Sequence, residues 1–289
     1  MKIAVASGKG GTGKTMVATS LAATLAPFYK TSLIDCDVEA PNAYLFLKPE
    51  FGSKIPAILQ IPRIDPNVCN FCSTCVDVCQ YHALAMIADQ ILVFPQLCHG
   101  CGSCSIACPV DAISEVEKEI GHIFQGRTAT GISHDMGVLI ASEPMPTPII
   151  HQLKALERDT ADITILDSPP GASCAVVATM YDADYILLVT EPTPFGLHDL
   201  KQMLGIIYKM DKPAGFIINR DGIGDDQVEK FIDQTPFKIL MIIPYQSEIA
   251  AGLGSGQLLT DLFPIYQEAF ITLFNQIAET IKPITGAIC

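Results

Sequence analysis

The N-terminal segment GKGGTGKT contains residues suited to binding phosphate. It fits the pattern G-x-x-x-x-G-K-[ST], follows an apolar strand-like run and opens a helical pattern. Its glycines let backbone N–H groups face phosphate oxygens, Lys14 is expected to contact the β- and γ-phosphates, and Thr15 is expected to bind Mg²⁺. The predicted nucleotide-binding residues are Gly8, Gly10, Gly11, Thr12, Gly13, Lys14, Thr15 and Met16. A glycine-rich turn without a ligand is the less favoured alternative.

Eight of the eleven cysteines form two runs with the spacing C-x2-C-x2-C-x3-C. Two such runs are specific for a bacterial-type ferredoxin with two 4Fe-4S clusters, in which the fourth cysteine of each run binds the other cluster. One cluster is therefore expected on Cys69, Cys72, Cys75 and Cys108. The second is expected on Cys98, Cys101, Cys104 and Cys79. Zinc is disfavoured, because zinc ribbons separate C-x2-C pairs by longer gaps.

The two runs differ where they end, and three further cysteines stand alone. The first run ends in CQY where the second ends in CP, so Gln80 is expected to alter the surroundings of Cys79 without preventing cluster binding. Cys36 and Cys174 are expected to be small buried apolar side chains. Cys289 is expected to be exposed at the terminus.

The segment KGGTGKT resembles the deviant Walker A motif of the MinD/ParA superfamily of SIMIBI-class P-loop ATPases. The resemblance implies that Lys9 reaches across a sandwich dimer to the nucleotide of the partner subunit, which would couple ATP binding to dimerisation. A solvated loop lysine is the alternative. The catalytic residues that the resemblance implies are Lys9, Lys14 and Asp37.

The resemblance continues in TSLIDCDVEAPN and ITILDSPPG. It implies that Asp37 positions the attacking water and that Gly171 senses the γ-phosphate. The implied Mg²⁺ residues are Thr15, Asp35 and Asp167. Acids at strand ends are otherwise ordinary caps, and this alternative stays open.

Two later segments extend the resemblance to the adenine site. Asn219 in FIINRDG corresponds to the position that contacts adenine in the relatives, and Ile243 and Pro244 resemble their base-lining loop. Asparagine at a strand end is also common turn chemistry.

The charge balance and hydropathy exclude several classes of protein. Eighteen Lys and Arg against 31 Asp and Glu give a net charge of −13, which disfavours binding to nucleic acid and to anionic membranes. No apolar run is long enough to span a membrane, and the N-terminus has no charged leader followed by an apolar segment. The sequence therefore predicts a cytoplasmic protein.

Short apolar runs alternate with helical patterns, which predicts an α/β fold with a mostly parallel P-loop sheet flanked by helices. Strands are expected near 2–7, 31–36, 137–141, 162–167, 183–190, 214–218 and 238–243. Helices are expected near 14–26, 147–157, 174–181, 197–210, 225–234 and 264–282.

The alternation breaks between about residues 53 and 113, where prolines and the cysteine runs dominate. This segment has too few apolar residues for a core of its own, so metal is expected to hold it together. Its two halves repeat at an interval of about 29 residues. The expected domains are a P-loop ATPase domain, 1–58 and 114–289, and an inserted ferredoxin-like α+β module, 59–113.

Taken whole, the chain is similar to MinD-superfamily ATPases that contain an inserted two-cluster ferredoxin domain. The resemblance implies a slow ATPase, stimulated by a partner or by redox state, that uses ATP/ADP, Mg²⁺ and two 4Fe-4S clusters. It would act as a homodimer, or as a heterodimer with a homologous ATPase, on a redox or metallocluster acceptor protein. The alternative is a MinD/ParA-like positioning or partitioning switch. The last helix, with Lys282 against Glu268 and Glu279, lacks the basic face of membrane-positioning relatives.

Overall fold

The computed structural model describes residues 1–156 and 161–281. Within these residues, nine strands form one sheet in the order β11-β10-β9-β1-β8-β2-β7-β6-β3, and all are parallel from β11 to β7. Strands β6 and β3 continue the sheet in antiparallel pairing. The sheet strands are β1 Lys2–Ala6, β2 Thr31–Asp35, β3 Glu50–Ile64, β6 Ile113–Arg127, β7 Ser133–Leu139, β8 Ile163–Asp167, β9 Tyr185–Thr190, β10 Ala214–Asp221 and β11 Lys238–Pro244.

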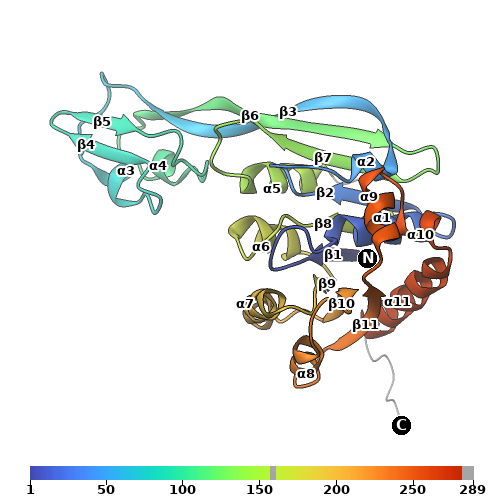
Figure 1. Cartoon of the computed structure of the whole chain (residues 1–289). Helices are drawn as coiled ribbons and strands as arrows, with labels where there is room; N and C mark the ends of the chain where they lie inside the picture. The colour runs from blue at the N-terminus through green and yellow to red at the C-terminus, as the bar shows by residue number, and fades with distance from the viewer. Residues whose placement is uncertain (157–160, 282–289) are drawn as a thin grey trace, which may run out of the picture.

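Helices cover both faces of this sheet (Figure 1). One face packs against α5 Thr147–Ala155, α6 Cys174–Met180, α7 Pro194–Met210 and α8 Gln227–Ile232. The other face packs against α1 Lys14–Leu25, α2 Tyr44–Leu47, α9 Ser247–Gly254, α10 Leu259–Leu262 and α11 Ile265–Ile281. Burial on both faces explains why the central parallel strands are continuous apolar runs.

Strands β3 and β6 form a long two-stranded ribbon that leaves the sheet and carries a small module at its far end (Figure 1). The pairing of β6 with β7 stops at Gly121, and the register of β3 shifts between Ala57 and Ile58 at the same level. Beyond this joint the ribbon continues to the pair Ile64 and Ile113. The ribbon is therefore one continuous element with its base in the main sheet and its tip in the module.

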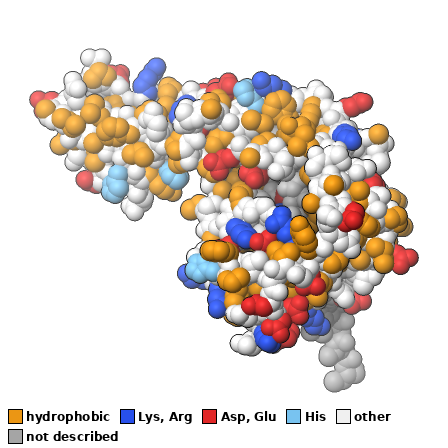
Figure 2. Space-filling model, viewed as in Figure 1, with side chains coloured by type: hydrophobic (Ala, Val, Ile, Leu, Met, Phe, Trp, Pro, Cys, Tyr) orange, Lys and Arg blue, Asp and Glu red, His pale blue; other side chains and the backbone are white. Residues whose placement is uncertain are grey.

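The module at the tip consists of two short helices and a hairpin, α3 Thr74–Asp77, β4 Leu84–Ile87, β5 Gln90–Val93 and α4 Ser103–Ile106. Its only core cluster among the described residues is small and includes Cys75, Leu84 and Cys104. Hydrophobic side chains also spread over its surface (Figure 2). Burial alone gives such a module little stability.

The seven strands and six helices predicted outside the cysteine-rich segment are confirmed, with shifted ends. The strand expected at 137–141 is Ser133–Leu139, and the helix expected at 225–234 is only Gln227–Ile232. The end predicted for the helix at 147–157 and the position of Lys282 lie outside the described residues.

Three short helices, α2, α9 and α10, and both long strands of the ribbon were missed. Strand β3 contains Pro56 and Pro62, and it is an edge strand of the sheet, the position where proline is tolerated. The boundaries expected after residues 58 and 113 fall within or at the start of these strands.

His134 on β7 gives the sheet a specific dependence on pH. Burial lowers its pKa to about 4, and the backbone at Leu33 offsets this only partly. The unfolded chain takes up a proton near the usual value of about 6.5, so this group's stabilisation is complete above that pH and is lost as pH falls toward 4. Between pH 7 and pH 5, wild type should lose about 2 kcal/mol of unfolding free energy relative to His134→Leu.

Urea unfolding of both proteins at the two pH values measures this difference. His151→Gln, which changes an exposed histidine on α5, is the matched control and should behave as wild type. An equal pH dependence in wild type and His134→Leu would contradict the assignment.

Candidate functional site

The phosphate-binding loop lies between β1 and α1 at the carboxyl edge of the parallel strands. Gly13 caps α1 with φ of 97°, and a Cβ at this position would lie 2.4 Å from Nδ2 of Asn219, so the loop requires glycine here. The Lys14 ammonium is buried and donates to Ser7 Oγ at 2.9 Å. Burial lowers its pKa, while the charges of Asp167 and Asp37 raise it. Bound phosphates would add the anionic partners that this lysine needs to stay charged.

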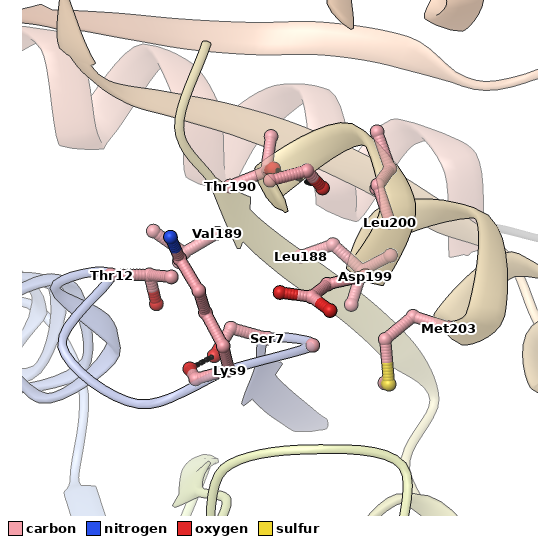
Figure 3. A pocket seen from close by; sticks show the side chains of 11 residues that line it. Ser7, Lys9, Thr12, Leu188, Val189, Thr190, Asp199, Leu200 and Met203 are labelled. Carbon is pink, nitrogen blue, oxygen red and sulfur yellow. Dashed lines mark hydrogen bonds between the residues drawn. The ribbon is translucent and has the colours of Figure 1, made fainter. Parts of the chain in front are cut away.

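Lys9 lines a pocket between the loop, β9 and α7 (Figure 3) and forms an ion pair within its own chain. Its ammonium contacts Oε1 of Glu191, which follows β9. Oε2 of the same carboxylate accepts from Nη1 of Arg220 at 3.2 Å. The Glu191 side chain is only 7% exposed, whereas Lys9 and Arg220 reach solvent. A buried carboxylate with two cations tolerates the loss of one of them better than an isolated pair does.

Asp35 and Asp167 lie side by side at the ends of β2 and β8. The Asp35 carboxylate accepts backbone N–H groups of Asp37, Asn42 and Ala43 at 2.9 to 3.1 Å, so it organises the loop after β2. Burial raises its pKa to about 6 despite these hydrogen bonds.

Asp167 is buried, and neither carboxylate oxygen has a hydrogen bond of good geometry among the described residues. Burial raises its pKa well above the usual range and Asp35 adds to this, while the nearby Thr15 hydroxyl and Lys14 lower it. A divalent cation beside Asp167 and Thr15 would relieve this unpaired charge, so the residues fit Mg²⁺. Mg²⁺ needs only one or two protein carboxylates, because water and substrate phosphates complete its shell.

The remaining residues predicted for the nucleotide site lie near the loop, where they contact other parts of the protein. Burial raises the pKa of Asp37, and Lys14 counteracts it, which places this carboxyl near the loop lysine. Nδ2 of Asn219 donates to the Thr12 carbonyl at 2.7 Å, so in this structure it ties β10 to the loop. Pro244 ends β11 beside it, since Ile243 pairs with Asn219. Met16 is buried in the first turn of α1.

The module brings the eight cysteines of the two runs together around two separate cavities. The inner cavity, about 380 Å³ with its open mouth, is lined by Cys79, Cys98, Cys101 and Cys104. The outer cavity, about 300 Å³ on the same basis, is lined by Cys69, Cys72, Cys75 and Cys108. Each cavity takes three cysteines from one run and the last cysteine of the other, which is the grouping expected from the spacing.

The 29-residue repeat is visible in the local geometry of both runs. The backbone N–H of Ala83 donates to Cys79 Sγ at 3.3 Å, and that of Ala112 donates to Cys108 Sγ at 3.2 Å. Left-handed backbone recurs at corresponding positions, namely Phe71 and Gly100, Ser73 and Gly102, and His82 and Asp111. N–H donors to cysteine sulfur stabilise the thiolate form, the form that ligates iron.

Each cavity offers four cysteine sulfurs, the donor set that a 4Fe-4S cluster requires. Within residues 1–156 and 161–281, no three His, Cys, Asp or Glu side chains converge closely enough to hold one metal ion. Around a 4Fe-4S cluster each thiolate binds a different iron, so the four sulfurs surround a cavity instead of meeting at a point.

The two described cysteines outside the runs, Cys36 and Cys174, differ in burial. Cys36 is buried in the core, as expected, and burial raises the pKa of its thiol. The burial expected for Cys174 is wrong, because this residue starts α6 with its side chain exposed. Cys289 lies outside the described residues.

Sequence analysis missed three polar residues, Glu191, Arg220 and Gln152. Glu191 stood in the segment TEPTPFGLHDLK, but nothing in the sequence pairs it with Lys9, 182 residues away. Gln152 on α5 exchanges hydrogen bonds with both backbone groups of Ile58 on β3, at 3.0 and 2.8 Å. No local pattern marks such a contact.

Comparison with known proteins gives relatives along the whole chain. The model of the CobQ/CobB/MinD/ParA nucleotide binding domain matches residues 3–259. An uncharacterized protein of Methanocaldococcus jannaschii is 30% identical over 97% of this chain and 98% of its own length. The iron-sulfur cluster carrier protein of Methanococcus maripaludis is 25% identical over 80% of this chain and 64% of its own.

Among solved structures, the septum site-determining protein MinD of Pyrococcus horikoshii, complexed with Mg-ADP, aligns with a TM-score of 0.59. The alignment covers 99% of both chains at 20% identity, which shows a shared fold. No helix among the described residues combines the length and apolarity that crossing a bilayer requires. On the evidence of its loop, its sheet and the matched family model, the chain belongs to the CobQ/CobB/MinD/ParA family of nucleotide-binding proteins.

Proposed function

We propose that this protein is an ATPase that binds two 4Fe-4S clusters and couples nucleotide-dependent dimer changes to electron transfer or metallocluster assembly on a partner protein. The observation that carries the proposal is the arrangement of the cysteines, which surround two cavities in crossed sets at the end of a ribbon rooted in the ATPase sheet. The alternative, a positioning or partitioning switch, leaves these eight cysteines without a role. The name of the Methanococcus maripaludis relative adds support from outside the chain.

In the nucleotide site, Lys14 would hold the β- and γ-phosphates, and Asp37 would position the attacking water. Thr15, Asp35 and Asp167 would form the Mg²⁺ site, with Asp35 acting through the loop it organises. Mg²⁺ supplies charge neutralisation for phosphoryl transfer. Asn219 and Pro244 would line the adenine site.

In the module, Cys69, Cys72, Cys75 and Cys108 would hold one cluster, and Cys79, Cys98, Cys101 and Cys104 the other. The domains would be 1–58 with 114–289 and the insert 59–113. The clusters supply one-electron chemistry when bound.

Helix α5 supports coupling between the two sites, since it contacts elements attached to each. Lys154 Nζ donates to the carbonyls of Ala178 and Thr179 at the end of α6, the helix that follows the Asp167 loop. Two residues earlier, Gln152 holds β3 at the joint of the ribbon. If α6 moved when the bound nucleotide changed, the hydrogen bonds of Lys154 and Gln152 on α5 would transmit that movement to the ribbon.

The proposal is tested on protein purified without oxygen. Iron and sulfide analysis should find two 4Fe-4S clusters per chain, and ATP turnover should differ between oxidised and dithionite-reduced protein. Iron-free protein that still hydrolyses ATP would overturn the cluster assignment. Iron-loaded protein whose turnover ignores cluster redox state would overturn the coupling alone.

Lys9→Ala should separate nucleotide binding from dimer formation. In the monomer Lys9 is held by Glu191, and crossing to a partner's nucleotide requires it to leave, with Arg220 remaining as counter-ion. The variant should bind ATP within a few-fold of wild type yet stay monomeric with ATP in light scattering. Lys209→Ala, an exposed lysine on α7, is the control. Normal ATP-dependent dimerisation of Lys9→Ala would rule out the role in trans.

A further inference from the structure

The two thiolate cavities differ at a pair of positions that the repeat makes equivalent. The residue after the first cysteine of each run is Asn70 in the outer cavity and His99 in the inner cavity. The second residue after the last cysteine is Val110 in the outer cavity and Tyr81 in the inner one. The repeat thus provides an internal comparison in which only the inner cavity has two aromatic rings.

The rings of Tyr81 and His99 stack on each other at the inner cavity. Their centroids are 3.5 Å apart with an interplanar angle of 12°, so they form one flat layer. Both residues line the inner cavity and are also exposed to solvent, so the layer lies between the cavity and solvent. Ring stacking of this kind is favourable beyond simple burial.

Cysteine exposure differs in the same direction. Cys98, the first cysteine of its run, is 8% exposed and buried in the inner cavity. Its equivalent in the outer cavity, Cys69, is only partly buried. This is the one equivalent pair that differs in burial class: Cys104 and Cys75 are both buried, Cys79 and Cys108 are both partly buried, and Cys101 and Cys72 are both exposed.

The cavities also differ in their distance from the ATPase part along the ribbon. Gln60, Pro62 and Glu115 of the ribbon line the inner cavity, whereas Ile64 and Ile113, the last pair of the ribbon, line the outer one. The inner cavity thus lies closer to the joint that α5 contacts. The outer cavity lies at the tip of the ribbon, farther from that joint.

We propose that the Tyr81–His99 layer closes the inner site against solutes, so that the inner cluster is retained while the outer site exchanges iron with iron-binding acceptors. This inference rests on the proposed function, because it requires that both cavities hold clusters. Tyr81 and His99 act as positioning residues that set access to the cluster. The shell around a metal site controls solvent access, and mutating residues of that outer shell typically costs about 10- to 100-fold in metal affinity.

The test follows iron release from the full-length, cluster-loaded protein into bathophenanthroline disulfonate, a bulky ferrous chelator. Excess dithionite keeps all released iron ferrous, and the sulfide leaves as hydrogen sulfide. Wild type should release half of its iron in a fast phase and half in a slow phase. Tyr81→Val combined with His99→Asn copies the outer residues into the inner site, and its slow phase should accelerate about tenfold or more.

The reciprocal double variant, Asn70→His with Val110→Tyr, is the matched control and should slow the fast phase. Cys69→Ser protein, which keeps only the inner cluster, should show the slow phase alone, and Cys98→Ser protein the fast phase alone. A single phase in fully loaded wild type, or an unchanged slow phase in the first double variant, would overturn the inference. Protein that never binds iron would instead overturn the proposed function.

Discussion

Lys14→Ala is expected to abolish ATP turnover, with a loss of kcat of about 10²- to 10³-fold or more. Its ammonium is the one cation buried within the loop of the described chain, between Ser7 Oγ and the charges of Asp167 and Asp37. Without it, charge developing on the transferred phosphoryl group would lose its nearest fixed donor. Phosphate release from ATP, measured under single-turnover conditions, gives the rate directly.

Two measurements distinguish a catalytic defect of Lys14→Ala from misfolding or loss of iron. The variant should retain its far-UV circular dichroism and its iron content, because Lys14 contacts no residue of the module in the described structure. Lys209→Ala should turn over ATP as wild type does. A Lys14→Ala rate within a few-fold of wild type would refute the role assigned to this lysine.

Cys108→Ser and Cys69→Ser are expected to remove the same cluster, although the two cysteines belong to different runs. Both line the outer cavity, together with Cys72 and Cys75. Either change should remove up to half of the iron and leave the other cluster, with the same residual spectrum in electron paramagnetic resonance. Each variant leaves a site with three thiolates, which holds a 4Fe-4S cluster poorly.

The matched pair is Cys79→Ser and Cys98→Ser, which should both remove the inner cluster. The double variant Cys69→Ser with Cys108→Ser should lose no more iron than either single variant. In contrast, Cys69→Ser with Cys79→Ser should lose nearly all of it. If Cys69→Ser with Cys79→Ser kept half of the iron, the cysteines would be grouped by run and the crossed arrangement would be wrong.

The parts of the fold that sequence predicted correctly are those whose pattern is local. Strands such as β8 and β9 are continuous apolar runs because helices cover both faces, and α1 starts at the glycine loop that defines the motif. The cysteines that line each cavity match the sets expected from the spacing, in which a short loop presents three thiolates to one cluster, and cluster binding by these sets stays a prediction.

The parts that sequence did not predict depend on contacts between distant segments. The ribbon is only partly buried, and its strand β3 contains prolines that an edge strand tolerates. Glu191 and Gln152 look like ordinary surface residues until β9 is placed beside β1 and α5 beside β3. Stacking of Tyr81 on His99 likewise needs the two runs to be folded against each other.

The crossed cysteine sets have a mechanical consequence for the ribbon. Each cavity joins the start of one run to the end of the other, so a bound cluster would act as a cross-link between the segment that leaves β3 and the segment that enters β6. Such a link removes chain entropy from the open state of the tip. Iron loss would therefore let β3 and β6 separate, starting at Ile64 and Ile113. The stiffness of the ribbon that carries the module would then depend on how much iron the module holds.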